Sequence, residues 1–74
     1  MKPWEERFVK EAMELHERAG KLRAMLEKHD RGELDFTPKC PIQLLREQLS
    51  VMRRYDEILR ERAKIEGVLL PEER

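Results

Sequence analysis

The sequence predicts an all-α fold, an antiparallel two-helix hairpin that assembles into a homo-oligomeric helical bundle. Apolar residues recur at helical spacing in both halves of the chain, and the stretch between the halves, GELDFTPKCP, is rich in residues that stop helices. The 74 residues are enough for one small domain. We therefore predict a helix at 3–31, a long Pro-containing loop at 32–40, a helix at 41–66 and a short C-terminal tail at 67–74.

The first predicted helix carries one apolar stripe. Pro3 suits its first turn, where a missing N–H is no loss, and Gly32 suits its end. Gly20 is either a tolerated exposed glycine or a point of close contact with another helix or a ligand, and whether the helix continues through it is left open. The stripe, which includes two alanines that would allow a neighbouring helix to approach closely, consists of Phe8, Ala12, Leu15, Ala19, Leu22 and Leu26.

The second predicted helix carries two apolar stripes, although a lone hairpin needs only one. We expect this helix to begin with Pro41 and to run to Glu66, where Gly67 provides a left-handed cap with Val68 as its apolar contact. The tail is too short to cover a second stripe, which favours self-association. The first stripe is Ile42, Leu45, Leu49, Met52, Leu59 and Ala63; the second, with its members seven residues apart, is Leu44, Val51, Ile58 and Ile65.

Polar residues on the second helix are the main candidates for a binding site. Gln48, Tyr55 and Arg62 stand seven apart between the two stripes. They either bond across helices and fix the register, or line a ligand pocket between subunits, with Tyr55 stacking on the ligand. A basic row along one flank is either a solvated face or an anion-binding ridge, because guanidinium groups suit phosphate. This row consists of Arg46, Arg53, Arg60 and Lys64.

The loop is longer than a helical hairpin requires. Two prolines stiffen it, and we expect Phe36 to fold back onto the helix ends as a buried plug. Thr37, Lys39 and the start of the second helix could then present N–H groups and positive charge to a phosphate. The alternative is that the length only spans two splayed helix ends. Cys40 is expected to be a small apolar or capping residue.

Composition and motifs narrow the class of function. The chain has 16 basic and 16 acidic residues, so net charge gives no reason to expect long nucleic acid or an anionic membrane as partner. One cysteine and two separated histidines make a poor metal site, and we expect no metal and no cofactor. No catalytic motif is present, so an enzyme is not expected. The chain lacks a signal peptide or an apolar span and is predicted to be cytoplasmic.

The stretch LDFTPKCPIQLLREQLSVMRRYDEILRERAKIEGV resembles a family of very small proteins of crAss-like and other tailed phages. The shared pattern, LL..Q...M..Y..IL..R, is met by Leu44, Leu45, Gln48, Met52, Tyr55, Ile58, Leu59 and Arg62. More loosely, the chain is similar to the phage anti-CBASS and anti-Thoeris hairpins, which oligomerise and sequester cyclic nucleotide immune signals between protomers. Individual pocket residues of those proteins cannot be matched to this sequence.

The leading hypothesis is a phage anti-defence protein of the host cytoplasm. It would bind and sequester a nucleotide-derived immune signal, of the cyclic oligonucleotide or ADP-ribose type, as a homo-oligomer and without catalysis. The alternative is a protein–protein interaction module that binds a host or phage protein through its spare apolar stripe. The candidate ligand-binding residues are Tyr55, Arg62, Gln48, Lys39, Thr37 and Arg53.

Overall fold

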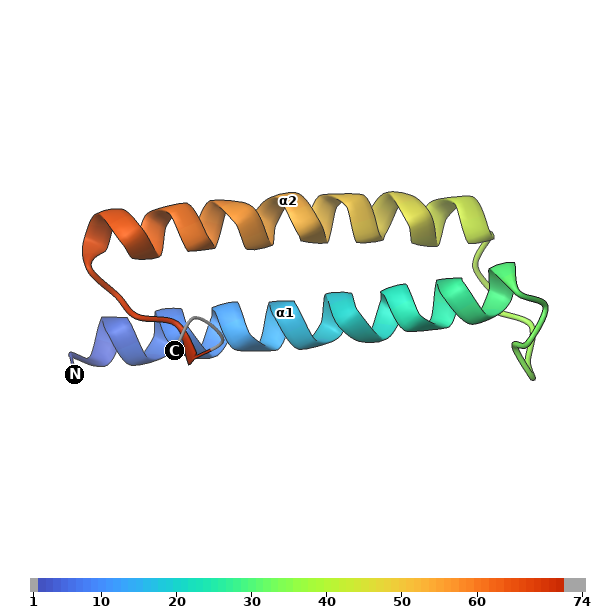
Figure 1. Cartoon of the computed structure of the whole chain (residues 1–74), viewed down its shortest axis with the longest axis horizontal. Helices are drawn as coiled ribbons and strands as arrows, with labels where there is room; N and C mark the ends of the chain where they lie inside the picture. Colours follow the sequence, from blue (N-terminus) through green and yellow to red (C-terminus); the bar gives the residue numbers. More distant parts are fainter. Residues whose placement is uncertain (1, 72–74) are drawn as a thin grey trace.

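The computed structural model describes residues 2–71 and confirms the all-α hairpin. Helix α1 spans Pro3–Asp30 and α2 spans Ile42–Glu66. The two helices lie side by side and antiparallel in a rod of 44 × 18 × 18 Å (Figure 1). Within the described residues, neither helix is long and apolar enough to cross a membrane. Of the predicted tail, residues 72–74 lie outside the described part of the chain.

The helix ends follow the predicted chemistry, with one correction. Gly67 is left-handed at φ 73°, and the amide of Val68 donates to the carbonyl oxygen of Ala63 at 2.8 Å, which closes α2 as predicted. Gly32 closes α1 in the same conformation, at φ 71°. The predicted start of α2 is one residue early. Pro41 has ψ 138° and precedes the helix as its N-cap, without a side-chain cap.

The predicted α1 stripe and the first α2 stripe form the seam between the helices. Ala12 and Ala63 are almost fully buried, and the small side chains at this level let the helices approach closely. Helix α1 is continuous through Gly20, which lies in its middle part. A Cβ added at Gly20 would meet nothing within 4 Å, so this glycine is not required for contact between helices within the hairpin.

The core is concentrated at the end of the rod away from the loop. Beyond α2, residues 67–71 turn back across the first part of α1 (Figure 1). Val68 and Leu70 are buried there, with Leu70 fully inaccessible. This use of the tail was not predicted beyond the cap contact of Val68. The cluster comprises Phe8, Ala12, Leu59, Ala63, Val68 and Leu70.

At the loop end, the prediction that Phe36 is a buried plug is wrong. Its side chain is 55% exposed. A polar clamp holds the helix ends instead, with Arg46 donating two hydrogen bonds to the Asp30 carboxylate, one of them at 3.3 Å. Leu34 and Pro38, not Phe36, are the half-buried apolar residues of the loop.

The second α2 stripe is uncovered in the hairpin. Exposed fractions are 53% for Leu44, 70% for Val51, 37% for Ile58 and 86% for Ile65. Neither α1 nor the described part of the tail buries any of these side chains. Within residues 2–71 the stripe therefore lacks a cover, as expected, while the predicted self-association stays a prediction.

Candidate functional site

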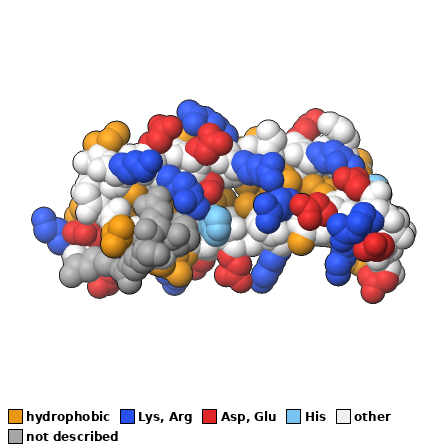
Figure 2. Space-filling model, viewed as in Figure 1, with side chains coloured by type: hydrophobic (Ala, Val, Ile, Leu, Met, Phe, Trp, Pro, Cys, Tyr) orange, Lys and Arg blue, Asp and Glu red, His pale blue; other side chains and the backbone are white. Residues whose placement is uncertain are grey.

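A small crevice opens between the helices near the middle of the rod. Its volume is about 230 Å³. Lys and Arg side chains from both helices lie along the face seen in Figure 2, interspersed with acidic side chains. Ala19 and Gly20 are the smallest residues of the lining. A Cβ built at Gly20 would meet nothing within 4 Å, so the crevice is open at this point. The lining residues are His16, Ala19, Gly20, Arg23, Arg53 and Asp56.

The acidic side chain of this crevice has charged partners within the described chain, whereas its arginines have few or none there. Asp56 accepts a hydrogen bond from Nε of Arg60 at 3.1 Å and lies 3.6 Å from Nδ1 of His16. Its negative charge is thus already matched within the chain. Arg23 reaches Glu27 only at 3.8 Å. Arg53 forms no hydrogen bond or ion pair with the other residues of the described chain. The crevice therefore holds an unmatched guanidinium beside a second, loosely paired one.

The predicted polar row of α2 lies on a different flank and has partners in its own chain. The Tyr55 hydroxyl donates to the carboxylate of Glu11 on α1. The guanidinium of Arg62 lies over the Phe8 ring, 4.8 Å from its centroid, and pairs with Glu66 at 3.0 Å. The contacts of Tyr55 with Glu11 and of Arg62 with Phe8 join α2 to α1, as expected of residues that fix the register, whereas the Arg62–Glu66 pair lies within α2.

Gln48 completes this row, and its only bond is weak. Its amide nitrogen lies 3.8 Å from the sulfur of Met52, one turn further along α2. The carbonyl oxygen and the rest of the exposed amide are free to meet a partner outside the hairpin.

The two predicted loop residues are remote from the other candidates. Thr37 and Lys39 are exposed at the loop end, whereas Arg62 lies near the end of α2, about 30 Å away at 1.5 Å per helical residue. Within one chain the six candidates therefore separate into three places: the loop, the polar row and the crevice. Arg53 is the only one of them that lines the crevice.

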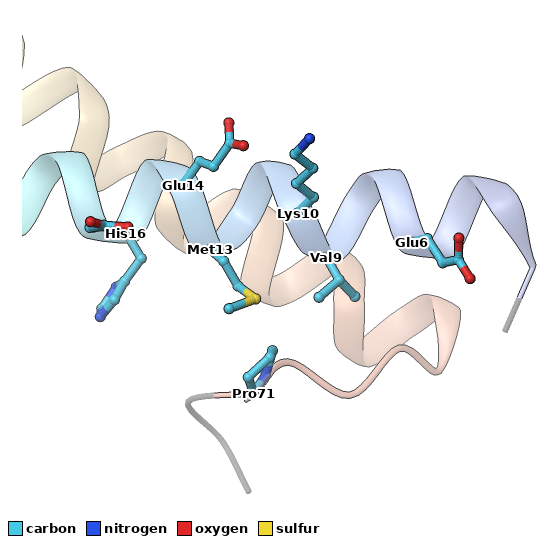
Figure 3. Close-up of a pocket in the computed structure, with 8 residues that line it drawn as sticks. Glu6, Val9, Lys10, Met13, Glu14, His16 and Pro71 are labelled. Atoms are coloured by element: carbon cyan, nitrogen blue, oxygen red, sulfur yellow. The ribbon is translucent and has the colours of Figure 1, made fainter.

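A larger groove lies between α1 and the tail and is mainly apolar. Val9 and Met13 point from α1 toward Pro71, while Lys10 and Glu14 point away (Figure 3). The groove suits an apolar group rather than an anion, because its one lysine is turned out of it.

The remaining predicted basic row is only partly available. Arg46 is engaged by Asp30, and Arg60 by Asp56 and by Nδ1 of His16 at 3.1 Å. Sequence reasoning missed Arg23, His16 and Gly20 as neighbours of Arg53. Their spacing on one flank of the first helix was a usable signal, but the opposing flank of α2 could be matched to it only once the helices were paired.

Metal-binding clusters and unsatisfied buried polar atoms are absent from the described residues. Residues 2–71 contain no group of three or more side chains that could hold a metal ion. They also contain no buried side-chain nitrogen or oxygen without a hydrogen-bond partner. The absence of catalysis stays a prediction.

Comparison with known proteins places the chain in a family. The family model described as Sequestin matches residues 2–65, which include α1, the loop and all but the last residue of α2. No curated protein and no solved structure shows a significant match. The family name suggests a sequestering function and agrees with the resemblance to small sequestering phage proteins, without saying what is sequestered. The chain belongs to the Sequestin family.

Proposed function

We propose that this protein sequesters an anionic, nucleotide-derived immune signal, of the cyclic oligonucleotide or ADP-ribose type, and does not alter it chemically. The observation that carries the proposal is the unmatched guanidinium of Arg53 over the inter-helix crevice. The Sequestin family name supports the sequestering part. The phage origin and host-cytoplasmic location follow from the sequence resemblance and belong to the same proposal.

The chemistry of the crevice favours phosphate as the recognised group. A guanidinium offers paired N–H donors that match two phosphate oxygens, and such charge-assisted bonds are stronger than neutral ones. Arg53 on α2 and Arg23 on α1 line the same space from opposite helices. The carboxylate of Asp56 would repel an anion if it were free, but Arg60 neutralises it.

The size of the crevice limits what it encloses. Sites that enclose a whole small molecule usually measure about 300–1,000 Å³, more than the 230 Å³ found here. The crevice therefore accommodates a phosphate group, with the rest of the ligand lying over the exposed basic face. In this proposal the ligand is held through its phosphate and released unchanged, which is the behaviour of a sponge.

The direct test is calorimetric titration with cyclic dinucleotides, cyclic trinucleotides, ADP-ribose and cyclic ADP-ribose. We expect at least one of these probes to bind the native protein. Arg53→Ala should weaken that binding at least about tenfold, the loss expected for one charge-assisted hydrogen bond. Arg54→Ala is the matched control, because Arg54 is the next residue, is equally charged, pairs with Glu57 at 3.3 Å and does not line the crevice.

Other variants locate the site if the crevice is not responsible. Lys39→Glu reports on the loop and Arg62→Ala on the polar row. Unchanged binding in Arg53→Ala together with loss in either of these variants would move the site away from the crevice. Failure of every probe to bind would refute the nucleotide part of the proposal.

The alternative function, a protein-binding module, is favoured by one observation. The second stripe of α2 leaves Val51 and Ile65 among the most exposed apolar side chains of the described chain. Soluble monomers seldom leave a continuous apolar surface uncovered.

A further inference from the structure

The exposed side of α2 has the repeat of a coiled-coil seam. Leu44, Val51, Ile58 and Ile65 recur every seven residues, and Gln48, Tyr55 and Arg62 follow four residues after the first three of them. Together they form the alternating a and d positions of a heptad, with the apolar residues at d. We call these seven residues the α2 seam. It is about 30 Å long, at 1.5 Å per residue.

We propose that a second copy of the chain covers the α2 seam, with the two α2 helices antiparallel about a two-fold axis. In an antiparallel pair, a positions of one helix face d positions of the other. Tyr55 then lies against Ile58 of the second copy. The same operation pairs Val51 with Arg62 and Gln48 with Ile65, so each polar residue meets an apolar one and no two like side chains meet. Leu44 would face position 69, beyond the end of α2 at Glu66, and lies outside the paired stretch.

Charge complementarity selects this register. Residues beside the seam at Glu47, Arg54 and Glu61 occupy g positions, which face one another across an antiparallel pair. In the proposed register Arg54 faces Glu61 of the second copy, and the two-fold axis makes that pair twice. A register shifted by one heptad would instead place Arg54 against Arg54 and Glu47 against Glu61.

The position of Arg62 argues against a parallel pair. A parallel, in-register pairing would bring Arg62 against its own copy and add like-charge repulsion at the seam. In the antiparallel arrangement it meets Val51. Its guanidinium is already turned onto Phe8 and Glu66 of its own chain, so its apolar stem is left to face the partner.

The α2 seam and the crevice lie on opposite flanks of the helix. Arg53 follows Val51 by two residues, which is about 200° of rotation at 3.6 residues per turn. Pairing through the seam therefore leaves the crevice open. The inference holds whether or not the crevice binds an anion, and a failed ligand titration would not bear on it.

Cysteine cross-linking tests direction and register together. In a Cys40→Ser background, we would prepare Gln48→Cys and Ile65→Cys, both at exposed positions where the hairpin itself is not disturbed. Mixing the two variants under mild oxidation should give a disulfide-linked dimer, and neither variant should cross-link alone. Cross-linking of Gln48→Cys by itself would show a parallel pair, and cross-linking only between Gln48→Cys and Ile58→Cys would show the shifted register. Either result overturns the proposal.

Charge reversal gives an independent check by analytical ultracentrifugation. Arg54→Glu should weaken the dimer at least about tenfold because it places two acidic side chains at each contact. The double variant Arg54→Glu/Glu61→Arg should restore it. Val51→Glu and Ile58→Glu should yield monomers with unchanged helix content. A native protein that is monomeric at micromolar concentration would overturn the inference, as would a charge swap that fails to restore the dimer.

Discussion

Gly20 destabilises α1 relative to alanine, although the space beside it would accommodate a side chain. A glycine inside a helix is about 1 kcal/mol less favourable than alanine, and here a Cβ would meet nothing within 4 Å. Gly20→Ala should therefore raise the free energy of unfolding by about 0.5–1 kcal/mol, measured by urea denaturation. Gly20→Leu should fill the crevice and weaken anion binding. A bulky residue here that leaves binding unchanged would show that the crevice is not the site.

Tyr55, which belongs to the α2 seam, forms a hydrogen bond to Glu11 that joins α2 to α1. Both side chains are exposed, so the bond is worth less than a buried one. Tyr55→Phe should lower the free energy of unfolding by about 0.5–1 kcal/mol. The expected pattern is that Tyr55→Phe has little further effect once Glu11 is Ala. Additive losses in this double-mutant cycle would mean that the bond does not contribute.

Among the elements, the tail is the least expected and the easiest to test. Leu70 is fully buried against both helices, while its neighbour Leu69 is 56% exposed. Leu70→Ala should lower the free energy of unfolding by about 2–4 kcal/mol, and Leu69→Ala by no more than about 0.5 kcal/mol. Chemical denaturation measures both. Equal effects would mean that the tail does not dock as described.

The clamp at the loop end depends on pH. The hydrogen bond from Arg46 is the main reason that the pKa of Asp30 lies below its ordinary value of 3.8. A lowered carboxyl pKa gives stability that is present above the ordinary pKa and is lost as pH falls through the lowered one. The melting temperature of the native protein should therefore exceed that of Asp30→Asn near neutral pH, and the difference should shrink below about pH 3.8. A difference that stays constant to acid pH would contradict the clamp.

At the scale of the whole molecule, periodicity predicted the hairpin. Two long segments with apolar residues alternately four and three apart form two long helices, and two joined helices have few other arrangements. The glycine caps were predictable for a different reason: a left-handed helix end is decided by local backbone geometry, which glycine favours. Phe36 was mispredicted because the position of a loop side chain depends on the three-dimensional path of the loop, which no sequence periodicity specifies. Leu70 was missed because a tail of a few residues has no periodicity to read.

The candidate site was less predictable than the fold. Arg53 was identified, but its neighbours Arg23 and Gly20 come from the other helix, and their proximity depends on the exact rotation of each helix about its axis. Tyr55 and Arg62 were assigned both a structural and a ligand-binding role from the sequence. Their contacts with Glu11 and Phe8 favour the structural one.

The central claim, sequestration without chemical change, is tested by recovering the ligand. The protein would be incubated with each cyclic oligonucleotide and ADP-ribose derivative, separated from free ligand, heat-denatured, and the released nucleotide identified by mass spectrometry. We expect one compound to be recovered unchanged and in stoichiometric amount from the native protein and from Arg54→Ala, and little from Arg53→Glu. Recovery of a hydrolysed product, or of no nucleotide from the native protein, would contradict the account.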